Sequence, residues 1–419
     1  MGEPARSDQD RCADARHCSK HLHAPCRAPR WRTPQYRVRD LSGDQGSGAL
    51  TMPPGLPANV RAETVGSFLR PAALLQARKE FGAGRISAAT LHAVEERAIR
   101  DIVGLQEELG FRLVTDGEFR RENWWIDFVS AIRGVEIVEG SQATTFDKNY
   151  VPRHVRTVDR LVVGEPILTA DYRFLAGSTR QAAKVTMPSP TRMHFHGGRR
   201  AISAAAYPDI DRFFSDVATI YQAEIAGLEE AGCNHIQIDD PLLTYFLSDR
   251  LRAEIIAEGD DPDRRLLTYL ELLNRCVEKR RRTTTVAIHL CRGNARSQWM
   301  IEGGYDGIAE RCFSLLDVDR YLLEFDDPRS GSFEPLRFMP RDKVVVLGLI
   351  TTKRPQLEDK NAVSRRIEEA MRFVDLDRLA ISPQCGFASV VEGNEITASD
   401  QRAKLELVVS VARQVWGAA

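Results

Sequence analysis

Residues 235–290 read HIQIDDPLLTYFLSDRLRAEIIAEGDDPDRRLLTYLELLNRCVEKRRRTTTVAIHL. This stretch begins with a short run rich in β-branched residues at 235–239 and ends with another at 285–290. Between the two runs, 263–282 places apolar residues three and four positions apart, as an amphipathic helix does. The pattern is typical of a parallel β/α unit, in which a helix connects one strand to the next strand of the same sheet.

The same alternation continues on both sides of this stretch. It predicts eight strands, at 61–67, 112–116, 183–187, 235–239, 285–290, 320–325, 343–349 and 379–382. Helical patterns lie between most of them, at 87–110, 211–231, 263–282, 304–316, 360–373 and 399–415. Eight strands with intervening helices favour an α/β fold, namely a closed (β/α)8 TIM barrel. An open doubly wound sheet is the alternative, but no Gly-x-Gly-x-x-Gly follows the first predicted strand.

Two regions depart from the barrel pattern. The largest insertion follows the second strand, at about 119–180, where 135–138 and 161–163 look like a hairpin laid over the barrel mouth. Residues 1–55 keep no apolar period, so we expect a disordered N-terminal leader ahead of a single catalytic barrel at 56–419. Met52 directly precedes the part expected to be ordered, and our hypothesis is that translation starts there.

The composition is that of an ordinary soluble globular protein. Of the 419 residues 43% are hydrophobic, and 58 basic and 59 acidic side chains leave a formal charge of −1. This balance gives no overall electrostatic preference for nucleic acid or an anionic membrane. We expect a cytoplasmic protein, because the chain has no secretory signal and no apolar run of the roughly 20 residues that span a membrane. Eight cysteines without regular spacing do not describe a disulfide scaffold and stay free for metal in a reducing compartment.

A histidine and two cysteines stand at the ends of predicted strands, where such a barrel has its active site. His289 and Cys291 are two residues apart, so their side chains point to the same side of the strand, and Cys385 follows the last strand. A lone cysteine on a strand is usually a small buried hydrophobe, but together these residues favour a zinc site with a vacancy for a substrate thiol. The favoured carboxylate ligand is Glu324, because it follows Leu322 by two residues and so points to the same face of the strand. Asp326 and Asp327, which follow it, compete for the role.

Other polar residues at strand ends are candidates for binding substrates. Asp239 either caps the helix that follows or binds a substrate ammonium, and Glu118 and Ser67 allow the same two interpretations. The pair Trp124 and Trp125 offers either a stacking surface or buried packing. Four basic residues are candidates for gripping an anionic donor, with solvated surface positions as the alternative: Arg192, His194, Arg292 and Lys353.

These residues carry a resemblance to a known family. From about 62 to 416 the chain resembles the catalytic barrel of cobalamin-independent methionine synthases, in the superfamily shared with epoxyalkane:coenzyme M transferases and uroporphyrinogen decarboxylases. The motifs that carry it are 65–67 (VGS), 116–119 (DGEF), 236–239 (IQID), 289–291 (HLC), Glu324 and 383–386 (PQCG). The resemblance implies that zinc is bound by His289, Cys291, Glu324 and Cys385. It also implies that homocysteine is held by Gly66, Ser67, Glu118 and Asp239.

The resemblance further implies an activity in methionine biosynthesis. It predicts a zinc-dependent methyltransferase similar to the 5-methyltetrahydropteroyltriglutamate–homocysteine S-methyltransferases, which converts homocysteine to methionine through a zinc-bound thiolate. Because no segment supplies a second barrel, the chain resembles the short, single-barrel branch of the family. Where folate-using members place a Trp, 185–190 read VTMPSP, so the choice of donor between a folate and a methyl-corrinoid stays open, as does the oligomeric state.

Three other functions are alternatives. An epoxide:thiol transferase of the coenzyme M type would need arginine for a sulfonate, where this sequence has Asp239 and Glu118. A non-catalytic zinc-binding barrel would hold the metal without alkylating any thiol. A metal-free decarboxylase of the superfamily is disfavoured by the complete set of His, Glu and two Cys.

Overall fold

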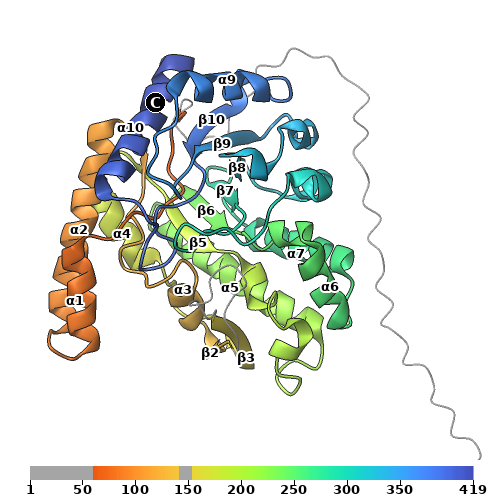
Figure 1. The fold of residues 1–419 in the computed structure, drawn as a ribbon. Coiled ribbons are helices and arrows are strands. Elements are labelled where there is room, and N and C mark those ends of the chain that lie inside the picture. Colours follow the sequence, from red (N-terminus) through yellow and green to blue (C-terminus); the bar gives the residue numbers. More distant parts are fainter. Residues whose placement is uncertain (1–59, 141–152, 419) are drawn as a thin grey trace, which may run out of the picture. The chain divides into compact units, whose positions relative to one another are not determined.

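The computed structural model describes residues 60–140 and 153–418. Helices and strands alternate along the chain (Figure 1). The predictions for the leader at 1–55, including the start at Met52, fall outside the described residues.

Six strands form one parallel sheet in the order β10-β9-β8-β7-β6-β5. Their bounds are β5 Val185–Pro188, β6 His235–Asp239, β7 Thr285–Leu290, β8 Arg320–Glu324, β9 Val344–Ile350 and β10 Leu379–Pro383. A further parallel pair consists of β1 (Leu113–Val114) and β4 (Ala182–Ala183), and β5 follows β4 after one residue. The β1–β4 pair therefore continues the sheet past β5.

Single backbone bridges close the sheet into a ring. Ala62 pairs with Ile381 of β10, and Ser67 pairs with Gly117 just after β1. The 60–67 segment thus lies between β10 and β1. With β4 and β5 counted as one strand, the ring has eight positions, and the predicted (β/α)8 TIM barrel is confirmed. The prediction of a continuous first strand is wrong, because the 60–67 segment pairs only through these bridges.

Helices that the apolar period predicted follow most of the strands. They are α2 Ala88–Leu109, α5 Ile210–Glu230, α7 Pro262–Val277, α8 Ala309–Leu315, α9 Lys360–Ala370 and α10 Ala398–Trp416. Four more helices were not predicted: α1 Ala72–Gly82, α3 Ile126–Ser130, α4 Thr169–Gly177 and α6 Asp249–Ala257. These four helices are short. In α1 only Leu74 and Ala77 are buried, so the sequence contains too few apolar residues at helical spacing to predict the helix. Two 3₁₀ turns, η5 (Pro328–Ser330) and η6 (Glu334–Phe338), stand in the connection from β8 to β9.

The strands bury both of their faces, as parallel strands in a barrel do. Their outward residues, such as Ile236 and Ile238 of β6, pack with helix residues in one large buried core. Their inward residues form a smaller cluster inside the ring, with one member from each of five strand positions: Val65, Ala287, Leu322, Val346 and Ala380. No helix in the described ranges is both long and apolar enough to cross a membrane.

The insertion after β1 carries the predicted hairpin. β2 (Arg133–Glu139) pairs antiparallel with β3 (Arg153–Val162), which begins earlier than the predicted 161. Thr157 of β3 bridges Ile202, in the turns that follow the C-terminal end of β5. The hairpin therefore borders the mouth of the barrel.

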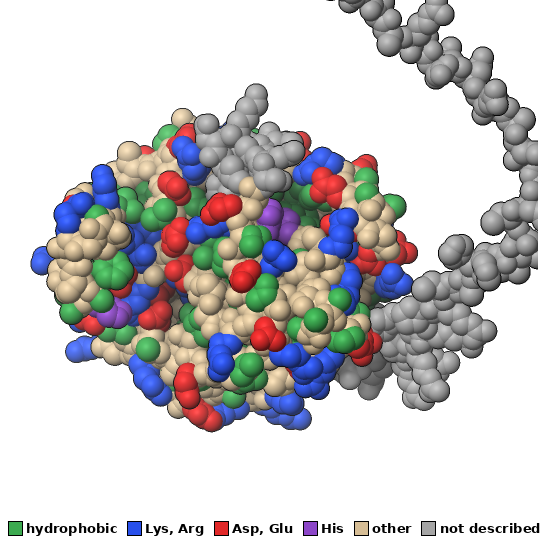
Figure 2. Space-filling view, turned by 90° about the horizontal axis from the view of Figure 1, so that it is seen from below, with side chains coloured by type: hydrophobic (Ala, Val, Ile, Leu, Met, Phe, Trp, Pro, Cys, Tyr) green, Lys and Arg blue, Asp and Glu red, His purple; other side chains and the backbone are tan. Residues whose placement is uncertain are grey.

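Charges of both signs are intermixed on the face shown in Figure 2. Neither Lys and Arg nor Asp and Glu form a continuous patch on that face, in keeping with the formal charge of −1. On this face the described surface offers no broad basic area of the kind that binds nucleic acid.

Candidate metal centre

A cavity of about 130 Å³ lies at the C-terminal ends of the barrel strands. Six of the eight residues that the sequence analysis assigned to the site line it: Ser67, Glu118, Asp239, His289, Cys291 and Cys385. They are spread along the chain from 67 to 385 and meet because the strand ends share one rim of the barrel. The other two, Gly66 and Glu324, do not line the cavity.

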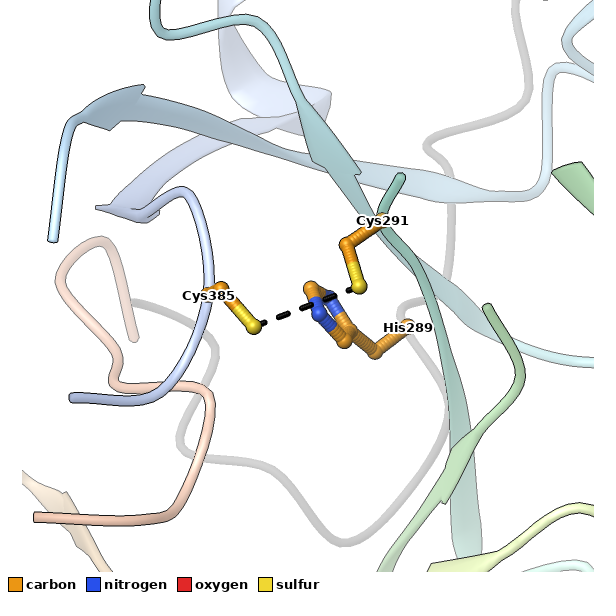
Figure 3. A group of neighbouring side chains, drawn as sticks. All are labelled: His289, Cys291 and Cys385. Atoms are coloured by element: carbon orange, nitrogen blue, oxygen red, sulfur yellow. Dashed lines mark hydrogen bonds between the residues drawn. The ribbon is translucent and has the colours of Figure 1, made fainter. Parts of the chain in front are cut away.

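His289, Cys291 and Cys385 lie together in this cavity and point toward one another (Figure 3). Their potential ligand atoms are all within 4.8 Å of one another, and the two Sγ atoms are 4.0 Å apart. His289 belongs to β7 and Cys291 follows directly after it, so the two-residue spacing puts both side chains on the inward side. Cys385 reaches them from the loop after β10.

This group of three side chains fits a zinc ion. Zinc binds thiolate sulfur at about 2.3 Å in tetrahedral geometry, which places two sulfurs about 3.8 Å apart. The observed Sγ–Sγ distance of 4.0 Å is close to that value. Neither ring nitrogen of the buried His289 makes a hydrogen bond of ordinary geometry with the described residues. A buried imidazole in that situation is costly, and a bond to a metal would satisfy it.

The three groups shift one another's pKa values. The hydrogen bond between the two thiols lowers the pKa of Cys385 well below its usual range and raises the pKa of Cys291 well above it. Burial lowers the pKa of His289, but Cys385, Asp239 and Glu324 raise it more. Without a metal, the arrangement thus favours a thiolate at Cys385 beside a protonated His289. Zinc would displace the protons of His289 and Cys291, because it is bound by neutral imidazole and by thiolate.

Glu324, the predicted fourth ligand, is not part of this group. Its Oε1 accepts hydrogen bonds from Lys353 Nζ at 3.2 Å and from Arg329 Nη2 at 2.5 Å. Its Oε2 accepts one from the backbone N–H of Arg292 at 2.7 Å. Burial raises the pKa of Glu324, but these three cations lower it more, to about 2. Both oxygens of this carboxylate are therefore engaged, by residues that follow β7, β8 and β9.

Two other buried carboxylates line the cavity. Asp239 Oδ1 accepts a hydrogen bond from Gln237 Nε2 at 2.7 Å. Glu118 Oε1 accepts one from Thr186 Oγ1 at 2.8 Å and lies 3.7 Å from Arg121 Nη1, whereas its Oε2 has no partner among the described residues. Burial raises the pKa of both, and for Asp239 the charge of Glu118 adds to the effect and brings the pKa to about 7. A positively charged group between them would relieve this repulsion.

Gly66 leaves room for Glu118, and Ser67 is tied to a neighbouring loop. A Cβ atom added at Gly66 would lie 2.7 Å from Thr186 Cγ2 and 3.1 Å from Glu118 Oε1, so only glycine lets Glu118 come this close. Ser67 is buried, and its Oγ accepts a hydrogen bond from the backbone N–H of Ala388 at 3.3 Å. The 60–67 segment is thereby tied to the loop that carries Cys385.

The four basic candidates are all buried, so the surface alternative is wrong for each of them: Arg192, His194, Arg292 and Lys353. Arg192 alone of the four lines the cavity, and its guanidinium stacks over the ring of Trp125 at 3.9 Å. His194 bonds to the hydroxyl of Tyr269. Trp125 is buried with one face covered by Arg192, whereas Trp124 is half-buried, and both rings line the cavity. Both interpretations of the pair therefore stay open.

Several residues that support the site escaped the sequence analysis. Arg70 donates hydrogen bonds to the carbonyl oxygens of Glu118, Arg121, Ala388 and Val390, and so joins two loops of the rim. Gln237 donates a hydrogen bond to Asp239 and precedes it by two residues on the same strand, so both side chains point to the same face. This spacing is a sequence signal from which the contact could have been predicted. Arg70 has no such signal, because its partners are backbone groups distant in sequence.

Comparisons with known proteins give the chain a context. Residues 60–414 match the family described as the catalytic domain of cobalamin-independent synthases. The uncharacterized Bacillus subtilis protein YxjH is 40% identical over 362 residues, which are 86% of this chain and 95% of that protein. A methionine synthase of Pyrococcus abyssi is 24% identical and aligns over 80% of this chain and 86% of its own length. A solved Listeria monocytogenes structure, described as a candidate vitamin-B12-independent methionine synthase, has a TM-score of 0.67 at 33% identity, covering 86% of this chain and 98% of that one.

Proposed function

Because the chain belongs to the family of cobalamin-independent methionine synthase catalytic domains, we propose that it is a zinc-dependent methyltransferase that converts homocysteine to methionine. One observation carries the proposal. A single cavity has a group of two thiols and an imidazole that fits zinc, and two buried carboxylates that fit an ammonium. Homocysteine carries both a thiol and an ammonium group.

His289, Cys291 and Cys385 would hold the metal. When bound, zinc would lower the pKa of the substrate thiol, so that its sulfur reacts as a thiolate at neutral pH. Glu324, which the resemblance implies as a fourth ligand, would first have to exchange Lys353 and Arg329 for the metal. The three grouped residues leave a fourth position for the substrate sulfur, as catalytic zinc sites do.

Asp239 and Glu118 would position the substrate. Asp239 on β6 stands in register with His289 on β7, and neighbouring strands are about 4.8 Å apart. A molecule whose ammonium contacts Asp239 therefore has its other end within reach of the thiols. A sulfur held beside the metal in this way would react faster than a thiol that has to be captured from solution.

The size of the cavity agrees with a substrate of this kind. Its volume of about 130 Å³ is near that of cavities of about 150 Å³ that take up a benzene-sized molecule. A small amino thiol fits this space, whereas a whole folate does not. Because a whole folate does not fit in this volume, we expect a folate or corrinoid donor to present its methyl group from the mouth of the barrel.

The test is incubation of the zinc-loaded protein with homocysteine and a panel of methylfolate, methylcobalamin and simple methyl donors. Mass spectrometry should detect methionine with at least one donor, and removal of zinc with a chelator should abolish it. A Cys385→Ser variant, incubated in the same way, serves as the matched control for background methylation. Zinc binding without methionine from any donor would instead support a non-catalytic zinc-binding barrel.

A further inference from the structure

Below the cavity, the interior of the barrel holds a chain of buried polar side chains. Glu63 Oε1 accepts a hydrogen bond from Arg320 Nε at 3.0 Å, and Glu63 Oε2 lies 3.3 Å from Lys184 Nζ. Lys184 Nζ also donates to Gln237 Oε1 at 2.7 Å, and Gln237 in turn donates to Asp239. Only Asp239, at the end of this chain, lines the cavity.

Lys184 imposes one orientation on the amide of Gln237. An ammonium group has donors and no acceptor, so the amide oxygen must face Lys184. The amide nitrogen then faces two acceptors, the carbonyl oxygen of Val65 at 2.6 Å and Asp239 Oδ1 at 2.7 Å. The reverse orientation would put nitrogen against the ammonium and oxygen against two oxygens, so it is excluded.

This orientation holds Asp239 without placing a cation against it. Its carboxylate accepts a hydrogen bond from a neutral amide, and no ion pair of Asp239 occurs in the described part of the chain. The cation of this hydrogen-bonded series, Lys184, is separated from Asp239 by Gln237 and pairs with Glu63. The carboxylate of Asp239 therefore lines the cavity with its Oδ1 held by a neutral amide and not by a cation.

The geometry points to Gln237, held by Lys184, as a positioning residue that selects thiols carrying an amino group. The inference rests on the proposed function, in which Asp239 binds the ammonium of the substrate. A thiol without an amino group would leave the carboxylates of Asp239 and Glu118 facing each other in a buried cavity. A site built to bond a polar group rejects the analogue that lacks it, because its own buried partners are then left unsatisfied.

The test compares two thiols that differ only in the amino group, homocysteine and 4-mercaptobutyrate. Isothermal titration calorimetry with the full-length, zinc-loaded protein should show that the wild type binds homocysteine about tenfold or more tightly than 4-mercaptobutyrate. In Gln237→Met this preference should shrink to about threefold or less, with unchanged zinc content and unchanged affinity for 4-mercaptobutyrate. Gln401→Met is the matched control, because Gln401 is also buried but bonds to the backbone N–H of Leu69 outside the barrel interior.

Lys184→Met provides a second route to the same answer, since it frees the amide of Gln237 to rotate, and the preference for homocysteine should again fall. This variant decides the matter if circular dichroism shows that Gln237→Met does not fold. Equal weakening of both thiols in these variants would show a merely structural role and overturn the inference, as would a wild type that binds both thiols equally well. Failure of the proposed function is distinguishable, because then neither thiol would bind the wild type more tightly with zinc than without it.

Discussion

Replacement of Glu324 by Gln tests whether this carboxylate balances buried cations or binds zinc. The residue belongs to a cluster of three acidic and three basic side chains that are buried except for the partly exposed Asp327. The members are Glu324, Asp326, Asp327, Arg292, Arg329 and Lys353. Their formal charges cancel. Glu324→Gln keeps the shape of the side chain but leaves one uncompensated positive charge in the cluster.

The magnitude follows from the burial of the three closest groups, because Glu324, Arg329 and Lys353 have side chains that are 0%, 7% and 3% exposed. Breaking a buried ion pair by removing one partner costs about 3–5 kcal/mol. The Gln oxygen still accepts one hydrogen bond, so we expect the lower end, about 3 kcal/mol, in the free energy of unfolding. We expect zinc to be retained at the wild-type level, because the three grouped ligands are untouched.

Two measurements check this prediction. Urea denaturation of the zinc-free protein gives the free energy of unfolding, and metal analysis of the purified protein gives zinc per chain. Glu254→Gln is the matched control, since Glu254 pairs with Arg250 on the surface and such pairs contribute about 1 kcal/mol or less. If Glu324→Gln unfolds like the wild type and yet has lost its zinc, Glu324 is a ligand and our account of its role is wrong.

Three further substitutions probe the site. Cys385→Ser should weaken zinc binding by about tenfold or more, whereas Cys312→Ser, at a buried thiol of α8, should not; equal zinc content in both would contradict the ligand assignment. Asp239→Asn should retain zinc but raise the homocysteine concentration for half-maximal turnover by about tenfold, because a charge-assisted bond is lost; loss of metal would show a different role. Gly66→Ala should weaken homocysteine binding in calorimetry, because its Cβ would lie 2.7 Å from Thr186 Cγ2, and unchanged affinity would refute that reasoning.

Much of the fold was predictable because its signals are local. β6 and β7 begin and end where the sequence predicts, at 235–239 and 285–290, since β-branched runs bounded by turn residues mark buried strands. The order of strands and helices then leaves few alternatives to a barrel. The 60–67 segment was harder, because it joins the ring through single bridges that depend on β10 and on the turn after β1.

The amino-acid sequence by itself determined that His289 and Cys291 share one side of a strand, because alternate residues of any strand do. It also determined that Glu324 faces inward with Leu322. Only the tertiary structure decided which partners these side chains meet. Cys385 lies beside His289 and Cys291, whereas Glu324 accepts a hydrogen bond from Lys353. The physical reason is that parity along one strand sets the direction of a side chain, while its contacts depend on the register of neighbouring strands and on the loops at the rim.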